Sequence, residues 1–339
     1  MQWIHDLRTR RKNLSESYLS IRDLVVEYSS GGEKVQAVNG IDLDLQKGET
    51  IGLVGETGAG KTTIAKTILR ILPTPPAKII KGQIKLDGTN LLELPEHEMQ
   101  KIRGNKIAMI FQDPMTALNP TMTVGEQINE VVLRHNHISR EEATKRTIEM
   151  LEMVGIASVR FHDYPHQFSG GMKQRVVIAM ALACNPELLL ADEPTTALDV
   201  TIQAQVLEMI KALKEKFNTS MILITHDLGV VAETCDKVAI VYAGEVVECG
   251  SKEQIFRNPL HPYTKGLFAS LPKLDDDSKR LKPIKGLPPD PTHLPQGCKF
   301  CPRCPHEDEC QEGRSEQAPM IEMEKGHFIR CHKIGKGGV

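Results

Sequence analysis

The chain lacks an apolar run long enough to cross a membrane. Its longest apolar stretch, residues 176–184, falls well short of the about 18 residues that identify a spanning helix. If the protein works at a membrane, another chain must therefore supply the span. We also expect no secretory signal, because residues 1–12 carry charges where such a peptide needs an apolar core. We interpret residues 1–17 as a basic, mobile N-terminal extension.

The sequence has no large excess of charge of either sign. Its 42 Lys and Arg residues nearly balance 44 Asp and Glu residues, which leaves a net charge of −2 at pH 7. Such a balance gives no electrostatic argument for a nucleic-acid partner. The content of 40% apolar and 25% charged residues is that of an ordinary soluble protein, and 339 residues are enough for two domains with sizeable cores.

The eight cysteines are distributed unevenly along the chain. Five of them crowd near the C-terminal end, namely Cys298, Cys301, Cys304, Cys310 and Cys331. Because no export signal is present, a metal site is favoured over disulfides. The first three match the opening of a ferredoxin-type run, although the next gap is longer, and four thiolates can also hold zinc. The residues alone are compatible with an iron–sulfur cluster, a structural zinc ion or free thiols. A segment so rich in proline would, however, need a bound metal to fold.

Residues 55–62, Gly-Glu-Thr-Gly-Ala-Gly-Lys-Thr, match the P-loop pattern. The context fits, because residues 49–54 predict a buried strand and residues 62–72 predict a helix. Backbone N–H groups at such a turn can point at phosphate oxygens, while Lys61 reaches the β- and γ-phosphates and the Thr62 hydroxyl binds Mg²⁺. The expected nucleotide contacts of this loop are Gly55, Glu56, Thr57, Gly58, Ala59, Gly60, Lys61, Thr62 and Thr63.

Two further motifs accompany the P-loop. Residues 188–193, Leu-Leu-Leu-Ala-Asp-Glu, predict an apolar strand that ends in Asp192, as a Walker B element requires for holding Mg²⁺. Glu193 would then orient or deprotonate the water that attacks the γ-phosphate. Residues 168–175 place Ser169 as the N-cap of a helix that begins with two glycines, which forms another anion-binding turn. The plainer alternatives are a strand that happens to end in an acidic turn and a helix that is merely capped.

The order of elements indicates an α/β fold. Residues 18–48 alternate apolar and polar residues and predict antiparallel strands. Predicted strands at 106–112, 187–192 and 220–225 alternate with helical segments, which implies a mainly parallel sheet covered on both faces. The sequence contains no internal repeat and no second P-loop. Composition changes after Gly250, with an exposed linker expected at residues 275–280 and a domain boundary near residue 255.

Along the chain, the P-loop comes first, residues 168–175 second and residues 188–193 third. Motifs in this order resemble the ATP-binding subunit of an ATP-binding-cassette (ABC) transporter over residues 19–250. Residues 258–267 and 297–305 resemble the C-terminal region of the ATPases that drive dipeptide and oligopeptide uptake in prokaryotes. The resemblance implies an ABC-type P-loop ATPase domain at 18–254, with an antiparallel β subdomain and a helical subdomain at about 115–167. It also implies a small, irregular, metal-binding C-terminal domain at 255–339.

The resemblance also implies roles for individual residues. Gln112 would lie near Mg²⁺ and the attacking water, and His226 would contact the γ-phosphate. Tyr28 matches the aromatic position that stacks on adenine, although a half-buried strand residue explains it nearly as well. The residues implied to contact the nucleotide of the opposite subunit or to cross the dimer interface are Ser169, Gly170, Gly171 and Asp199. Phe168 stands where this signature usually begins with Leu, for which we expect altered packing rather than lost activity.

For the cysteines, the family pattern implies a [4Fe–4S] cluster on Cys298, Cys304, Cys310 and Cys331, with Cys301 as an extra thiol or a substitute ligand and zinc as the alternative metal. The partners implied are a second ABC ATPase subunit, more often a paralogue, two transmembrane permease subunits and an external peptide-binding protein. The implied location is peripheral, on the cytoplasmic face of the cell membrane, and no nucleic acid is expected. The alternatives are uptake of nickel chelates or oligosaccharides, a soluble non-transport ABC ATPase, and a regulatory C-terminal module on a poorly active ATPase.

Overall fold

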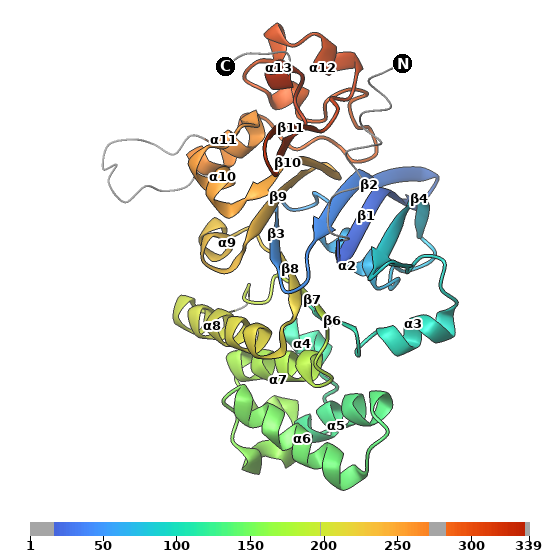
Figure 1. The fold of residues 1–339 in the computed structure, drawn as a ribbon, viewed down its shortest axis with the longest axis vertical. Helices are drawn as coiled ribbons and strands as arrows, with labels where there is room; N and C mark the ends of the chain where they lie inside the picture. Colours follow the sequence, from blue (N-terminus) through green and yellow to red (C-terminus); the bar gives the residue numbers. More distant parts are fainter. Residues whose placement is uncertain (1–16, 197, 271–282, 336–339) are drawn as a thin grey trace.

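The computed structural model describes residues 17–196, 198–270 and 283–335. The predicted N-terminal extension, apart from residue 17, and the predicted linker at 275–280 lie outside these described residues. Two sheets form the centre of the molecule, with a group of helices at one end and the C-terminal segment at the other (Figure 1). The α/β architecture predicted from the alternation of strands and helices is confirmed.

An antiparallel sheet of four strands, in the order β2-β1-β4-β5, lies beside the P-loop helix (Figure 1). Alternate apolar side chains of its longest strands are buried, which explains why the period-2 pattern was visible in the sequence. The strands are longer than the short runs that the pattern predicted. They are β1 (Leu19–Ser30), β2 (Glu33–Leu45), β4 (Ala77–Leu86) and β5 (Thr89–Asn90).

The main sheet has eight strands in the order β11-β12-β10-β9-β3-β8-β7-β6. From β9 to β6 neighbouring strands run parallel, and β3, β6, β7 and β8 are buried along their whole length. Burial on both faces accounts for their continuous apolar runs. The strands are β3 (Thr50–Val54), β6 (Ile107–Ile110), β7 (Leu188–Asp192), β8 (Ser220–Ile224), β9 (Lys237–Tyr242), β10 (Glu245–Ser251), β11 (Ile321–Glu324) and β12 (His327–Ile329).

Helices cover the main sheet and build a separate lobe below it (Figure 1). In that lobe α5 (Val124–His135) and α6 (Arg140–Met153) pack together, and each begins at a capping hydroxyl, Thr123 and Ser139. α2 ends at residue 68 rather than at the expected 72, because Arg70 has a φ of 52° and Pro73 follows. The other helices are α2 (Lys61–Ile68), α3 (Glu96–Ile102), α4 (Pro114–Ala117), α7 (Gly170–Leu182), α8 (Val200–Phe217), α9 (Leu228–Thr234), α10 (Lys252–Arg257), α11 (Pro262–Ala269), α12 (Glu312–Ser315) and α13 (His332–Gly335).

The C-terminal segment extends the main sheet. β12 pairs antiparallel with β10, with Ile329 opposite Glu248, and β11 then pairs with β12. Tyr263 and Phe300 are almost fully buried in a core that they share with residues of the main sheet. α10 crosses the predicted boundary at 254/255, which stays a prediction. Across the described ranges, none of the helices is both long and apolar enough to span a bilayer.

Candidate nucleotide site and cysteine pocket

The P-loop occupies the turn between the buried strand β3 and helix α2, as its sequence predicts. Gly60 has a φ of 97°, and a β-carbon added there would lie 2.2 Å from the carbonyl oxygen of Ala37. A β-carbon on Gly55 would lie 2.1 Å from the carbonyl oxygen of Val241. These two glycines are therefore required by close backbone packing on both sides of the loop.

Lys61 lies inside the loop that it follows. Its ammonium group donates hydrogen bonds to the carbonyl oxygens of Gly55, at 2.7 Å, and Glu56, at 2.9 Å. Burial lowers the pKa of Lys61, an effect that the carboxylates of Glu193, Asp192 and Glu56 oppose. The loop thus concentrates positive charge where a phosphate group would be bound.

The side chain of Thr62, in α2, contacts that of Asp192, at the end of β7. The Thr62 hydroxyl donates to a carboxylate oxygen of Asp192 at 3.1 Å, at the end of β7. Burial raises the pKa of Asp192, while the hydrogen bond from Thr62 opposes the rise. A bound cation would favour the ionised carboxylate, and a hydroxyl beside a carboxylate is a ligand pair that suits Mg²⁺.

The other predicted catalytic residues, Gln112 and His226, contact the carboxylate of Glu193. One carboxylate oxygen accepts hydrogen bonds from Gln112 Nε2, at 2.9 Å, and from Thr196 Oγ1, at 2.8 Å. The other lies 3.3 Å from Nδ1 of His226. Residues from three different connections, after β6, β7 and β8, therefore converge on one carboxylate. Thr196 was not predicted, because nothing in its local sequence distinguishes it from other threonines.

The charge of Glu193 is maintained by these neighbours. Burial opposes it, but hydrogen bonds from Thr196 and His226 outweigh that effect and lower the pKa of Glu193. The residue also has a φ of 47°, which is uncommon for a side chain other than Gly, Asn or Asp. A strained residue with an ionised carboxylate beside a phosphate-binding loop is suited to activating water.

The predicted signature residues lie at the surface. Ser169 caps α7 and Asp199 caps α8, and both are exposed. In the part of the chain that the structure describes, the hydrogen bonds of Ser169 stay within its own helix start. A β-carbon on Gly171 would lie 2.8 Å from Cγ2 of Ile202, so α7 packs closely against α8. Among the described residues, no hydrogen bond joins this turn to the chain's own P-loop.

Two aromatic residues singled out in the sequence are Tyr28 and Phe168. The Tyr28 hydroxyl lies 3.5 Å from that of Thr63, which places this half-buried ring beside the P-loop helix. Its adenine-stacking role stays a prediction. Phe168 is only 5% exposed, and the guanidinium of Arg160 lies 4.4 Å from its ring centre. The departure from Leu is thus accommodated by a packed ring under a cation.

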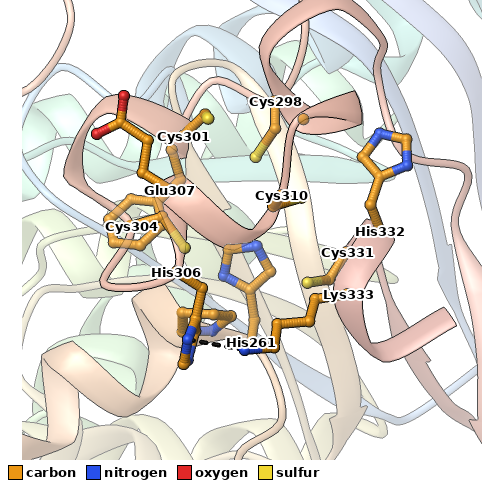
Figure 2. Close-up of a pocket in the computed structure, with 13 residues that line it drawn as sticks. His261, Cys298, Cys301, Cys304, His306, Glu307, Cys310, Cys331, His332 and Lys333 are labelled. Atoms are coloured by element: carbon orange, nitrogen blue, oxygen red, sulfur yellow. Dashed lines mark hydrogen bonds between the residues drawn. The ribbon is translucent and has the colours of Figure 1, made fainter. Parts of the chain in front are cut away.

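All five clustered cysteines line a single pocket in the C-terminal segment (Figure 2). The sulfurs of Cys310 and Cys301 lie 3.0 and 3.8 Å from the position that a β-carbon on Gly313 would take. Burial raises the pKa of Cys298 to about 12 and also raises the pKa of Cys304. The donor set suits a soft metal, yet across the described residues no three His, Cys, Asp or Glu side chains are already arranged to hold one.

The sequence did not predict the contact between this segment and the P-loop. Arg303, in a short 3₁₀ turn between two of the cysteines, forms two hydrogen bonds with the carboxylate of Glu56, at 2.8 and 3.0 Å. The hydroxyl of Tyr263 accepts a hydrogen bond from the backbone N–H of Glu56 at 3.0 Å. The partners are more than 200 residues apart, so no local signal could have identified them.

Comparison with known proteins shows the family to which the chain belongs. A family model described as "ABC transporter" matches residues 38–196, and one described as "Oligopeptide/dipeptide transporter, C-terminal region" matches residues 247–310. The chain is 50% identical to the oligopeptide transport ATP-binding protein OppD of Bacillus subtilis, over 92% of this chain and 87% of that protein. It is 53% identical to the dipeptide transport ATP-binding protein DppD of the same organism, over 86% and 88%.

More distant proteins show the same relationship. OppD of Escherichia coli is 46% identical over 94% of both chains. The dimeric structure of a post-hydrolysis state of the ATP-binding cassette MJ0796, bound to ADP and phosphate, has a TM-score of 0.63 at 30% identity, covering 69% of this chain and 98% of that one. These relatives show that the chain belongs to the ATP-hydrolysing subunits of ABC transporters.

Proposed function

We propose that the chain hydrolyses ATP to drive the uptake of dipeptides or oligopeptides, working on the cytoplasmic face of the cell membrane. The observation that carries the ATPase part is the convergence of Gln112 and His226 on Glu193, one residue after the buried Asp192. The peptide part is supported by relatives named for oligopeptide and dipeptide transport, whose similarity extends over the C-terminal region.

Within one chain, each motif has a separate task. The backbone of residues 55–60 surrounds the phosphates, and Lys61 exchanges its two carbonyl contacts for phosphate oxygens. Thr62, Gln112 and Asp192 would hold Mg²⁺, which would neutralise phosphate charge when bound. Glu193 accepts a proton from the attacking water, and His226 keeps the carboxylate in place.

A complete site requires two chains. Ser169 and Asp199 are exposed, and among the described residues the hydrogen bonds of Ser169 stay within its own helix start, so this turn can contact nucleotide held by another subunit. MJ0796, a related cassette, is dimeric in its solved structure. We propose a second ABC ATPase, more often a paralogue, as the partner, with two permease subunits and an external peptide-binding protein completing the transporter. ATP joins the two ATPases and hydrolysis separates them.

Reconstitution tests the transport assignment. The chain is co-expressed with its membrane subunits and placed in vesicles, and ATP hydrolysis is measured with peptides, nickel chelates or oligosaccharides supplied through the binding protein. We expect the complex to co-purify and its ATPase rate to rise with peptides alone. Stimulation by an oligosaccharide or a nickel chelate instead would reassign the cargo. Failure to associate with any membrane subunit would favour a soluble ATPase.

We further propose that the cysteine pocket binds a [4Fe–4S] cluster, with zinc as the alternative metal. Support comes from five thiols that line one pocket in a segment with few regular elements. The ligands proposed are Cys298, Cys304, Cys310 and Cys331, with Cys301 as a substitute. When bound, the centre supplies a cross-link between turns that have little apolar core of their own. Because ligation requires thiolates, loading must overcome the burial that raises the pKa of Cys298.

Metal analysis tests this second proposal. On protein purified without oxygen, we expect about four irons and four acid-labile sulfides per chain, the composition of such a cluster. A matched chain with Cys184→Ser, a buried cysteine outside the pocket, should retain the same content. One zinc without sulfide would identify a structural zinc site, and neither metal would leave five free thiols.

A further inference from the structure

The P-loop is held from outside by the segment that carries the cysteines. Arg303 lies in the turn between Cys301 and Cys304, and its guanidinium pairs with both carboxylate oxygens of Glu56, a P-loop residue. Such a two-bond fork fixes orientation as well as distance. An arginine guanidinium stays protonated in proteins, so the cation of this pair is permanent.

Arg303 itself is rigidly held. Its side chain is only 6% exposed, against 28% for that of Glu56. Its remaining donors reach the carbonyl oxygen of Lys285, at 3.0 Å, and the hydroxyl of Tyr242, at 3.2 Å. A movement of this turn would therefore be passed to Glu56 rather than absorbed by a flexible side chain.

A second contact reaches the same P-loop residue. The backbone N–H of Glu56 donates to the hydroxyl of Tyr263, whose ring packs against Tyr242, at 4.6 Å, and Phe300, at 5.4 Å between ring centres. Phe300 lies between Cys298 and Cys301 and itself lines the cysteine pocket. Side chain and backbone of Glu56 are thus both bound to groups that adjoin the pocket.

We propose that Arg303 is a positioning residue for the P-loop, through which the conformation of the cysteine-lined turn sets the affinity for nucleotide. Glu56 and Lys61 share the loop, and Lys61 bonds to the carbonyl oxygen of Glu56. Displacing Glu56 therefore displaces the cation and the N–H groups that receive phosphate. The pocket acts on nucleotide binding and leaves the chemistry at Glu193 unchanged.

The first test measures binding of Mg-ADP to the full chain by calorimetry. We expect Arg303→Met to weaken binding roughly tenfold, the change that about 1.4 kcal/mol would give. Arg303→Lys keeps the charge but loses the two-bond geometry, so its affinity for Mg-ADP should lie between those of Arg303→Met and the unmodified chain. Glu56→Gln should weaken Mg-ADP binding as much as Arg303→Met does. The double variant should bind Mg-ADP no more weakly than either single variant. Additive losses would show that the two residues act independently and would overturn the proposal.

A matched control separates positioning from general stability. Arg22 and Asp44 form another two-bond pair, at 2.7 Å, on β1 and β2. We expect Arg22→Met to leave Mg-ADP affinity unchanged. Hydrogen exchange should show faster exchange at residues 55–61 in Arg303→Met and no such change in Arg22→Met. Faster exchange across the whole chain would reveal a merely structural role. If Arg303→Met fails to fold, Glu56→Gln, which alters the other residue of the pair, is compared with Arg22→Met in the same two measurements.

The second test perturbs the pocket itself. Cys304→Ser, next to Arg303, should weaken Mg-ADP binding in the unmodified chain and have no further effect when Glu56→Gln is already present. An equal loss in both backgrounds would mean that the pocket does not act through the Arg303–Glu56 pair. No loss in either background would show that the turn does not control the loop.

Discussion

Replacing Glu193 by glutamine should nearly abolish ATP hydrolysis while leaving ATP binding intact. The amide keeps the shape of the side chain and can still accept from Thr196, but it cannot take a proton from water. General-base catalysis is worth about 100- to 10,000-fold, so the ATPase rate of the assembled transporter should fall by that order. Phosphate release measures the rate. Calorimetry of ATP binding and the ATP-dependent dimer on gel filtration should show that the bound state now accumulates.

The same strand offers a matched control for this substitution. Glu187 precedes β7, at the end opposite Glu193, and its carboxylate accepts from Tyr18, at 3.3 Å, and lies 3.4 Å from Lys47. Glu187→Gln removes a surface ion pair, which is worth about 1 kcal/mol or less. Its ATPase rate should therefore equal that of the unmodified chain. Equal rates for Glu193→Gln would remove Glu193 from its assigned role.

The second large effect concerns two glycines of the P-loop that differ in their surroundings. Both have positive φ, 81° for Gly58 and 97° for Gly60, so alanine at either position incurs the left-handed cost of about 1–2 kcal/mol. Gly58 has no neighbour within 4 Å of an added β-carbon, whereas at Gly60 the Ala37 carbonyl oxygen lies 2.2 Å away. Gly60→Ala must therefore displace backbone and should lose about 1–3 kcal/mol more.

Urea unfolding of the nucleotide-free chain measures this difference, with Gly58→Ala as the internal control for backbone strain. Without nucleotide, any contact of the new methyl group with phosphate is removed from the comparison. We expect Gly60→Ala to be the less stable variant and to bind nucleotide poorly, because β2 and the loop can no longer pack together. Equal losses of unfolding free energy at the two positions would contradict the tight approach of Ala37.

The parts of this protein that the sequence predicted are those with local signals. The P-loop, the strand ending in Asp192 and the helix capped by Ser169 each combine a period of apolar residues with special turn residues. β11 and β12 lack such a signal, because they are only four and three residues long and β11 is largely exposed, so only the pairing of β12 with β10 and of β11 with β12 defines them.

Contacts between distant segments were beyond prediction for the same physical reason. The sequence of residues 261–263, His-Pro-Tyr, gives no sign of a contact with the P-loop. In the structure His261 caps α11, and burial lowers its pKa to about 3, while Tyr263 reaches the P-loop. Arg303 looks like an ordinary surface charge in the sequence, and the P-loop motif predicts no partner for the carboxylate of Glu56. Their pairing depends on the complete fold, which no periodicity encodes.

The late arrival of β12 has a consequence for synthesis on the ribosome. The P-loop, the loops that carry Glu193 and His226, and β10 are all translated before residues 327–329, which can pair with β10 only after they have been made. At about 5–20 residues per second, several seconds pass in which the edge of β10 offers unpaired N–H and C=O groups. Open strand edges recruit other strands, so nascent chains on one messenger are exposed to mispairing during this interval. A chaperone that covers β10 would be most effective at this stage, when the ATP-binding part is otherwise complete.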